Sequence, residues 1–258
     1  MVSRASMQYL YDENGKRFLD CISNVQHVGH CHPTVVEAIS KQLATSTCNV
    51  RFVSTQLADC AEQLLKTLPG LDTILFCNSG SEANDLALLL TMATSQQQWK
   101  CPPTNSTTVL HYLNQNGFTS HLVQMFIAYG GNPVACAAVI SVMKVVREEN
   151  LLAHSQKMGE ELEVALNELK QKHESIGDIR GVGLFWGIDL VKSRDSREPD
   201  QRLALDVILE LRQKYGILLN ADGPYTNILK IKPPLCFDKS NVLETVSALD
   251  QVLTHFNR

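Results

Sequence analysis

Residues 73–84, TILFCNSGSEAN, indicate the fold class of this chain. Thr73–Cys77 is a short continuous apolar run, which is typical of a buried strand. The small polar residues 78–81 follow this run, and a helix is predicted to begin near Glu82. A strand, a glycine-containing turn and a helix in this order predict an α/β domain.

The turn in this stretch has two possible roles. A helix N-terminus exposes backbone N–H groups, so Ser79, Gly80 and Ser81 could bind a phosphate or another anion. Gly80, which has no side chain, would let such a ligand approach the backbone closely. Alternatively, Ser79 is an ordinary N-cap and Glu82 interacts favourably with the helix dipole. The spacing alone favours the second role.

The sequence on either side of this stretch predicts further helices and strands. A β-hairpin is expected over Tyr9–Cys21, because two apolar runs flank a polar turn that ends in glycine. Apolar residues at helical spacing predict helices from Pro33 onward, over about 57–68, 133–149, 152–172 and 199–214, and over 239–256. Strands are predicted at 183–191, 216–220 and 228–231. Residues 151–258 are therefore expected to form an α+β unit.

Composition excludes several classes of protein. The chain has 258 residues, of which 44% are hydrophobic, and a formal net charge of -4 without a long run of like charges. This balance argues against a nucleic-acid partner. The longest apolar run, Leu86–Leu90, is far shorter than the ~18 residues that a membrane span requires. The first residues show no targeting signal, so a cytoplasmic location is expected, with mitochondria as the alternative.

Histidines and cysteines gather in residues 27–33, HVGHCHP, where a metal site could be suspected. The spacing argues against one, because Cys31 and His32 are adjacent and no second ligand pair stands at zinc-finger spacing. A turn-forming loop that ends in a helix start at Pro33 is expected instead, and no metal. The eight cysteines form no CxxC pair and are expected to be buried reduced thiols.

Two glycine-rich segments complete the set of motifs. Arg180 lies within GDIRGVG, residues 177–183, and its planar guanidinium suits a carboxylate or a phosphate. An ion pair between Arg180 and Asp178 is the alternative, and it is favoured without further context. Residues 129–133, YGGNP, are expected to form a tight turn that opens a helix.

Taken together and in this order, these segments resemble the class III (fold type I) pyridoxal-phosphate-dependent aminotransferase family. The resemblance rests on residues 9–33, on NSGSEAND at 78–85, on YGGNP at 129–133 and on GDIRGVGLFWGIDL at 177–190. The segments CISNV at 21–25, HVGHCHP at 27–33 and NILKIKPP at 227–234 are especially similar to the phospho-lyases that act on ethanolamine phosphate or 5-phosphohydroxy-L-lysine.

The resemblance implies a fold, a cofactor and partners. It implies a truncated fold type I large domain followed by a C-terminal α+β small domain. It also implies pyridoxal 5'-phosphate, a small amino-phosphate or amino-acid substrate, and a homodimer or a pairing with a full-length homologue. In this scheme Ser79, Gly80 and Ser81 hold the cofactor phosphate, Arg180 binds an anionic group of the substrate, and Asn24 contacts the substrate phosphate.

The same resemblance implies a division of the chain. An N-terminal segment at 1–32 is followed by the large-domain part at 33–93 and an unrelated linker-like stretch at 94–125. An interface turn and long helix at 126–150 lead to the small domain at 151–258.

The stretch at 94–125 stands where the family has its ring-stacking aromatic residue, the Asp of the ring nitrogen, the Schiff-base Lys and most of the large-domain sheet. None of the thirteen lysines lies in a segment that resembles the family's cofactor lysine, so no catalytic residue is predicted. Ala128 stands where the family has a Thr that reaches the partner's cofactor phosphate.

Three functions therefore stay open at this point. The first is an enzyme, either a phospho-lyase or a transaminase. The second is a non-catalytic truncated homologue that pairs at most with a full-length subunit. The third is a new binding module, formed by repacking of the remaining helices. Loss of the sheet would expose the apolar faces of the helices around residues 35–68 and 82–93, which argues against this alternative.

Overall fold

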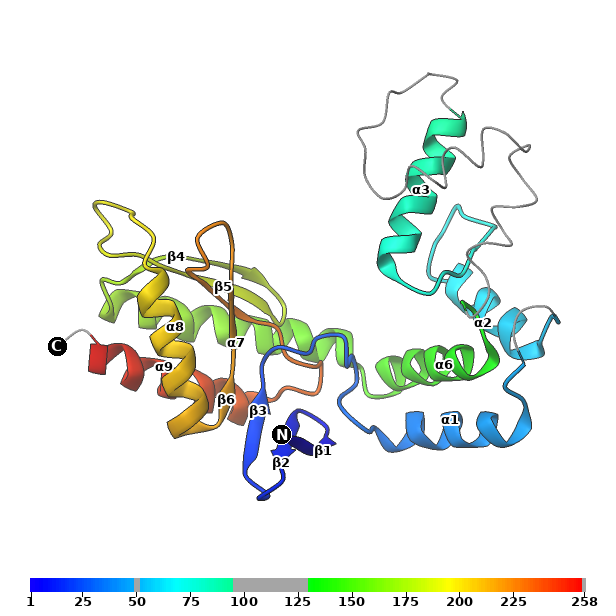
Figure 1. Cartoon of the computed structure of the whole chain (residues 1–258), viewed down its shortest axis with the longest axis horizontal. Coiled ribbons are helices and arrows are strands. Elements are labelled where there is room, and N and C mark those ends of the chain that lie inside the picture. The colour runs from blue at the N-terminus through cyan, green and yellow to red at the C-terminus, as the bar shows by residue number, and fades with distance from the viewer. Residues whose placement is uncertain (49–51, 95–129, 257–258) are drawn as a thin grey trace. The chain divides into compact units, whose positions relative to one another are not determined.

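The computed structural model describes residues 1–48, 52–94 and 130–256 of the chain (Figure 1). These residues divide into two compact units, each described by itself below. The first unit combines residues 1–34 with 142–258, and the second spans 35–141. Apart from Thr94, the predicted linker at 94–125 lies outside the described residues, as do Lys100, Ala128 and Tyr129.

One sheet of the first unit is built on the N-terminal residues. Strands β1 (Val2–Ser6), β2 (Tyr9–Asp12) and β3 (Arg17–Asp20) run antiparallel, and β6 (Ile217–Leu218) pairs in parallel with β3. The predicted hairpin is confirmed. Its turn forms because the Asp12 carboxylate accepts the backbone N–H groups of Asn14 at 2.9 Å and Lys16 at 2.8 Å. The N-terminal segment thus belongs to the same compact unit as the C-terminal residues.

The second sheet of this unit has the order β4–β5–β8–β7, with all neighbours antiparallel. Its strands are β4 (Ile176–Val182), β5 (Phe185–Leu190), β8 (Ile228–Ile231) and β7 (Asn220–Asp222). The sequence did not predict β4, because its glycines interrupt the apolar pattern. A Cβ atom on Gly181 would lie 2.4 Å from the Phe185 carbonyl oxygen, so this glycine permits the close pairing of β4 with β5.

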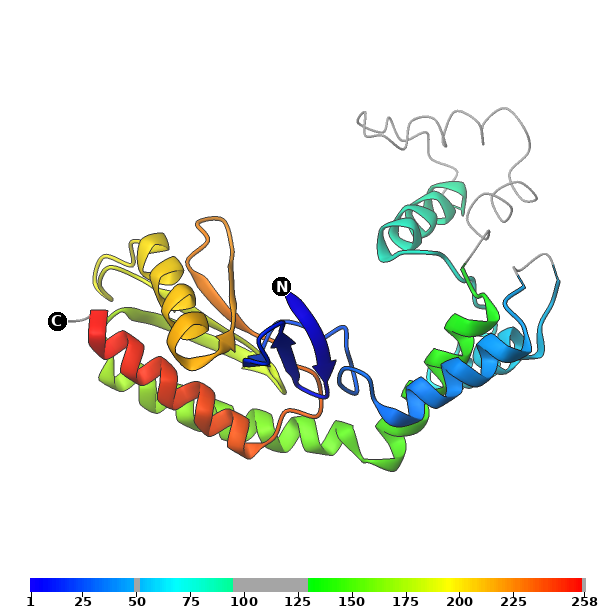
Figure 2. The same ribbon diagram turned by 60° about the horizontal axis from the view of Figure 1, so that its bottom comes forward.

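Helices cover this sheet and close the core. Helix α7 (Leu151–Lys172) packs against β4, and α8 (Gln201–Glu210) packs against β5 and β7 before the π-helical turn η1 (Leu211–Tyr215). Helix α9 (Lys239–Phe256) lies alongside α7 (Figure 2). The helices predicted here are confirmed. Leu162, Leu166 and Leu249 are fully buried where these elements meet, so the apolar face read from the sequence is the core face.

The second unit consists of helices and irregular segments. Its helices are α2 (Thr55–Leu65), α3 (Gly80–Thr94) and most of α1 (Pro33–Thr45) and α6 (Pro133–Glu148). All four were expected. The strand predicted at Thr73–Cys77 is wrong, because residues 71–77 form no regular structure and Leu75 is 46% exposed. A strand needs a neighbour for its backbone hydrogen bonds, and the described part of this unit contains no strand.

The core of the second unit is small. Its buried apolar side chains, among the described residues, are Cys60, Leu86, Cys136 and Ala137. Large apolar side chains are exposed instead on α1, α3 and the connecting segments, namely Val36, Leu43, Phe52, Leu68, Leu71, Leu88 and Leu90. The helices of this unit therefore leave part of their apolar surface exposed in the described part of the chain.

Candidate functional site

The glycine turn of residues 78–81 leads directly into α3 (Figure 1). Ser79 Oγ accepts a hydrogen bond from the backbone N–H of Glu82 at 3.2 Å. In return, the Glu82 carboxylate accepts the backbone N–H of Asn78 at 2.8 Å. These reciprocal bonds resemble a capping box, so Ser79 has the N-cap role that the spacing favoured.

The same turn keeps the features of an anion site. Gly80 and Ser81 are exposed, and a Cβ atom on Gly80 would meet no atom within 4 Å. The first N–H groups of α3 and its dipole favour a phosphate at this end of the helix. The Glu82 carboxylate already accepts one N–H group there, so a bound phosphate would experience its negative charge. The turn can therefore bind a phosphate, with one acidic neighbour opposing it.

The turn of residues 130–132 packs against the segment that leads into the glycine turn. Gly130 packs so closely on Cys77 that a Cβ atom on Gly130 would lie 2.8 Å from the Cys77 carbonyl carbon. Gly131 has a φ of +76° and approaches Phe76, and Asn132 caps α6 by accepting the N–H of Ala135 at 3.0 Å. The tight turn predicted at 129–133 is thus confirmed for its described residues. Its contact with Phe76 and Cys77, which directly precede the turn of residues 78–81, was not predicted, because it joins segments far apart in the sequence.

Arg180 lies within β4, a strand that the sequence did not predict. Its guanidinium donates to the Asp178 carboxylate at 2.8 Å and lies 4.0 Å from the Asp189 carboxylate. Although burial of Asp178 would raise its pKa, the hydrogen bond from Arg180 and other contacts lower it. The structure thus gives Arg180 the ion-pair partner named as the alternative. An anionic ligand would have to compete with Asp178 for the guanidinium.

Asn24 lies exposed in the loop between β3 and α1. The buried Asp20 carboxylate shapes the start of this loop by accepting the N–H groups of Ile22 at 2.9 Å and Ser23 at 3.0 Å. Its other oxygen lies 2.8 Å from His30 Nε2, near the end of the loop. Sequence reasoning missed Asp20, although an Asp followed closely by a polar loop is a recognisable turn signal.

The histidine loop is held by carboxylates. His30 contacts Asp20, and His32 Nε2 lies 3.0 Å from the Glu149 carboxylate before α1 begins at Pro33. The predicted loop and helix start are confirmed. In the described part of the chain, no group of three or more His, Cys, Asp or Glu side chains is arranged to hold a metal ion. Cys31 is exposed, which differs from the expectation of buried thiols, whereas Cys21, Cys60 and Cys136 are buried.

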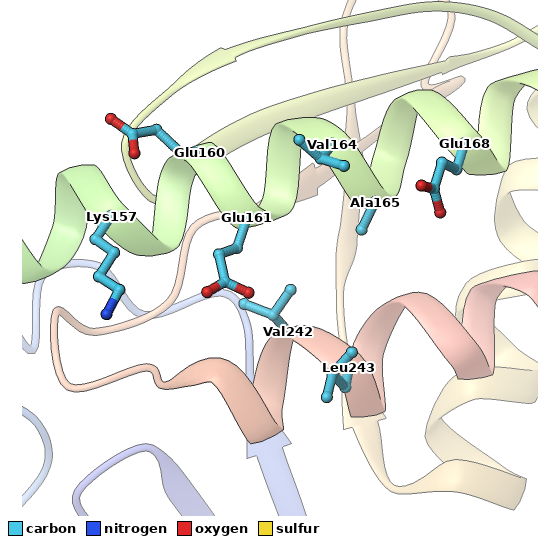
Figure 3. Close-up of a pocket in the computed structure, with 8 residues that line it drawn as sticks. All are labelled: Lys157, Glu160, Glu161, Val164, Ala165, Glu168, Val242 and Leu243. Atoms are coloured by element: carbon cyan, nitrogen blue, oxygen red, sulfur yellow. The ribbon is translucent and has the colours of Figure 1, made fainter.

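The predicted site residues fall into two groups. Ser79, Gly80 and Ser81 belong to the second unit, whereas Asn24 and Arg180 belong to the first. A groove of about 480 Å³ between α7 and α9 contains none of them (Figure 3). Val164 and Leu243 line this groove together with Glu160, Glu161 and Glu168.

No helix within the described ranges is long and apolar enough to cross a membrane.

The fit of a pyridoxal phosphate group to these residues is partial. Its phosphate fits the open N-terminus of α3, where Gly80 leaves room for it. Its aldehyde needs a lysine. The described lysines of the second unit are Lys41 on α1 and Lys66 after α2, and Lys66 is paired with Glu62 at 2.7 Å. Neither lies in a segment that resembles the family's cofactor lysine, so the described residues fit the phosphate of the group but not its aldehyde.

Comparison with known proteins defines the class. The fold matches a solved phospholyase from Arthrobacter in complex with phosphoethanolamine, with a TM-score of 0.83 and 22% identity over 98% of this chain and 94% of that one. It also matches an ornithine aminotransferase from Plasmodium yoelii, with a TM-score of 0.77 and 20% identity over 99% of this chain and 94% of that one. The chain therefore has the fold of these two proteins, in agreement with the fold type I architecture that the resemblance implied.

The sequence then defines the family. The family model "Aminotransferase class-III" matches residues 1–126 and 119–253, so the chain belongs to this family. The match includes residues 94–125, so it extends further than the resemblance predicted. The "Ethanolamine-phosphate phospho-lyase homolog 1" of Caenorhabditis elegans is 48% identical over 100% of this chain and 89% of that protein. The "Alanine--glyoxylate aminotransferase 2-like" protein of Drosophila melanogaster is 29% identical over 98% of this chain and 82% of that protein.

The length of these alignments carries information about the chain. The alignment with the Caenorhabditis elegans relative spans 416 positions, whereas this chain has 258 residues. More than a third of the aligned positions therefore have no residue of this chain opposite them.

The family's enzymes use pyridoxal 5'-phosphate, which agrees with the cofactor that the resemblance implied.

Proposed function

We propose that this protein is a member of the phospho-lyase branch, whose chemistry is the elimination of phosphate and ammonia from a small phosphorylated amine. The substrate class is ethanolamine phosphate or 5-phosphohydroxy-L-lysine, with transamination of an amino acid as the variant reaction. The observation that carries the proposal is the NSGSE turn at the start of α3, in a chain whose 48%-identical relative is named for ethanolamine phosphate. The phosphoethanolamine in the Arthrobacter structure supports the same substrate class.

The chain's own residues have distinct parts in this proposal. Gly80 and Ser81 bind the cofactor phosphate through the N-terminus of α3, and Ser79 holds the turn in shape through its capping bond. Asn24 contacts the phosphate of the substrate, and Asp20 fixes the loop that carries Asn24. Arg180 binds an anionic group of the substrate once it exchanges Asp178 for the ligand. When bound, pyridoxal phosphate supplies an aldehyde for the amine and a ring that withdraws electrons.

A specific observation favours a second function, that of a non-catalytic truncated homologue. The lysines described in the unit that contains the anion turn are Lys41 and Lys66, and the aligned relative is much longer than this chain. Without a lysine that would hold the aldehyde of the cofactor and move the substrate proton, phosphate contacts give binding but not catalysis. Under this alternative, the large domain has lost its internal part.

One experiment separates the two functions. The purified chain is incubated with pyridoxal phosphate and reduced with borohydride, and the lysine adducts are located by peptide mass spectrometry. For the enzyme, we expect a single saturable adduct that ethanolamine phosphate competes away. Scattered labelling over many lysines, or none, would assign the chain to the non-catalytic class. Gly80→Asp adds a carboxylate at the phosphate turn, and we expect it to remove only the saturable adduct.

The oligomeric state is part of the proposal. We infer that the chain forms a homodimer or pairs with a full-length homologue, because apolar side chains on α1 and α3 are exposed in the second unit. Co-purification with a tagged full-length homologue tests the pairing. If the chain neither binds this homologue nor changes its activity, and is monomeric by itself, the inference is wrong. The cytoplasmic location stays a prediction of the sequence.

A further inference from the structure

Two buried thiols meet in the small core of the second unit. Cys60 lies on α2 and is 0% exposed, and Cys136 lies on α6 and is 2% exposed. Both are free cysteines, and each thiol affects the pKa of the other, which places the two side chains close together. With Leu86 and Ala137, they make up the buried apolar side chains described for this unit.

The backbone geometry explains why these two side chains meet. A Cβ atom on Gly131, just before α6, would lie 2.9 Å from Leu57 Cδ1 on α2. Cys60 follows Leu57 by three residues and therefore shares a helix face with it. The Cys136 thiol donates to the Gly131 carbonyl at 3.4 Å, which holds its sulfur beside the same contact. The second turn of α2 and the first turn of α6 thus bring the two thiols close together in the core of this unit.

We propose that Cys60 and Cys136 form a reversible disulfide that cross-links α2 to α6. The cross-link would close a loop that runs from residue 60 to residue 136. Such a loop stabilises a fold mainly because it restricts the unfolded chain. A unit with a small core gains most from this restriction, since its few apolar contacts leave it marginally stable.

The reaction needs an oxidant, for which a small-molecule disulfide such as oxidised glutathione serves. The thiolate of one of the two cysteines attacks one sulfur of the reagent, forms a mixed disulfide and releases the first small thiol. The thiolate of the other cysteine then attacks the protein sulfur of this mixed disulfide and expels the second small thiol. The two protein thiols lose two protons and two electrons in total, and the reagent takes up both as it becomes two thiols.

The environment of the thiols makes the reaction depend on the conformation of this unit. Burial raises the pKa of both groups, that of Cys136 to about 12, so few thiolates are present in the closed unit. Because neither thiol is exposed, the reagent reaches them only when the unit opens transiently. Formation of the disulfide thus reports on opening of this unit.

The test oxidises the folded full chain with a series of glutathione redox buffers, alkylates the remaining thiols and maps the peptides by mass spectrometry. We expect a peptide pair joined through Cys60 and Cys136, a mass lower by two hydrogens, and a melting temperature that rises on oxidation and returns with dithiothreitol. Limited proteolysis between residues 60 and 136 should slow by about tenfold or more in the oxidised chain.

Serine variants of three cysteines test the cross-link, and an alanine variant serves as a second measurement. Cys60→Ser and Cys136→Ser should abolish the cross-link and the rise in melting temperature, whereas Cys48→Ser in the same unit should retain both. Circular dichroism of each variant establishes that it is folded, and Cys60→Ala replaces any serine variant that is not. A rise that persists in Cys60→Ser or Cys60→Ala would overturn the proposal. So would a native chain whose pair stays reduced while the exposed Cys31 is glutathionylated.

Discussion

At the scale of single residues, buried charges and caps explain how the first unit keeps its shape. Arg194 is the main cap of α7. Its guanidinium donates to the carbonyl oxygens of Lys170, of His173 at 3.0 Å and of Ile176 at 3.1 Å, and so joins the last turn of α7 to the segment that follows it. This role was not predicted, because Arg194 lies far from α7 along the chain.

Arg194→Ala is expected to destabilise the protein by roughly 2–3 kcal/mol, because hydrogen bonds from a charged donor to several carbonyls are lost. Denaturant unfolding followed by circular dichroism measures this change. Arg197→Ala, an exposed position in the same loop, is the control and should have little effect. Equal effects of the two substitutions would contradict the capping role.

Asp20 predicts a dependence of stability on pH. Burial would raise its pKa, but the hydrogen bonds from His30 and from the N–H groups of Ile22 and Ser23 outweigh burial and lower it below the ordinary value of 3.8. A lowered pKa in the folded state means that the stabilisation is present above about pH 4 and is lost as the pH falls through the folded-state pKa.

Asp20→Asn should therefore cost about 1–3 kcal/mol at pH 7 and flatten the fall of unfolding free energy below pH 4. Denaturation curves at a series of pH values measure both effects. Asp195→Asn, at an exposed position, is the control. A mutant whose stability falls with acid as steeply as that of the wild type would show that Asp20 is not responsible.

At the scale of elements, close backbone approach decides how α7 meets the β4–β5 hairpin. Gly159 lies in the middle of α7, and a Cβ atom there would lie 2.6 Å from the backbone of Gly183. Glycine is unfavourable inside a helix by itself. The structure retains it because any side chain would push the hairpin away from α7.

Gly159→Ala is thus expected to destabilise the protein by about 1–3 kcal/mol, although alanine favours the helical backbone. The unfolding free energy again provides the measurement. Gly80→Ala is the matched control, since a Cβ atom there meets nothing within 4 Å, and its stability should be nearly unchanged or slightly higher. Stabilisation by Gly159→Ala would mean that the contact with Gly183 is not close in solution.

At the scale of the whole molecule, the two units differ in how much apolar surface they bury. The first unit has a core of fully buried leucine and isoleucine side chains from two sheets and three helices. The second unit buries few apolar side chains among its described residues and exposes several large ones. Since burial of apolar surface is the main stabilising contribution, the second unit should open first.

Hydrogen exchange measured by mass spectrometry tests this difference. Backbone amides of α7, β5 and α9 should exchange at least about a hundredfold more slowly than those of α1, α2 and α3. Similar protection in both units would contradict the prediction. It would imply that a partner or a second copy covers the apolar side chains of the second unit.

The sequence by itself determined the family, the helices and most strands, because these follow from local periodicity, turn residues and motif order. It also indicated the capping role of Ser79 and the pairing of Arg180 with Asp178, since the partners are two or three residues away. Only the tertiary structure showed that Thr73–Cys77 has no strand partner. It also showed that Asp20 holds the loop of Asn24 and that Cys60 lies close to Cys136. Each of these depends on contacts between segments distant in the sequence, which no local pattern encodes.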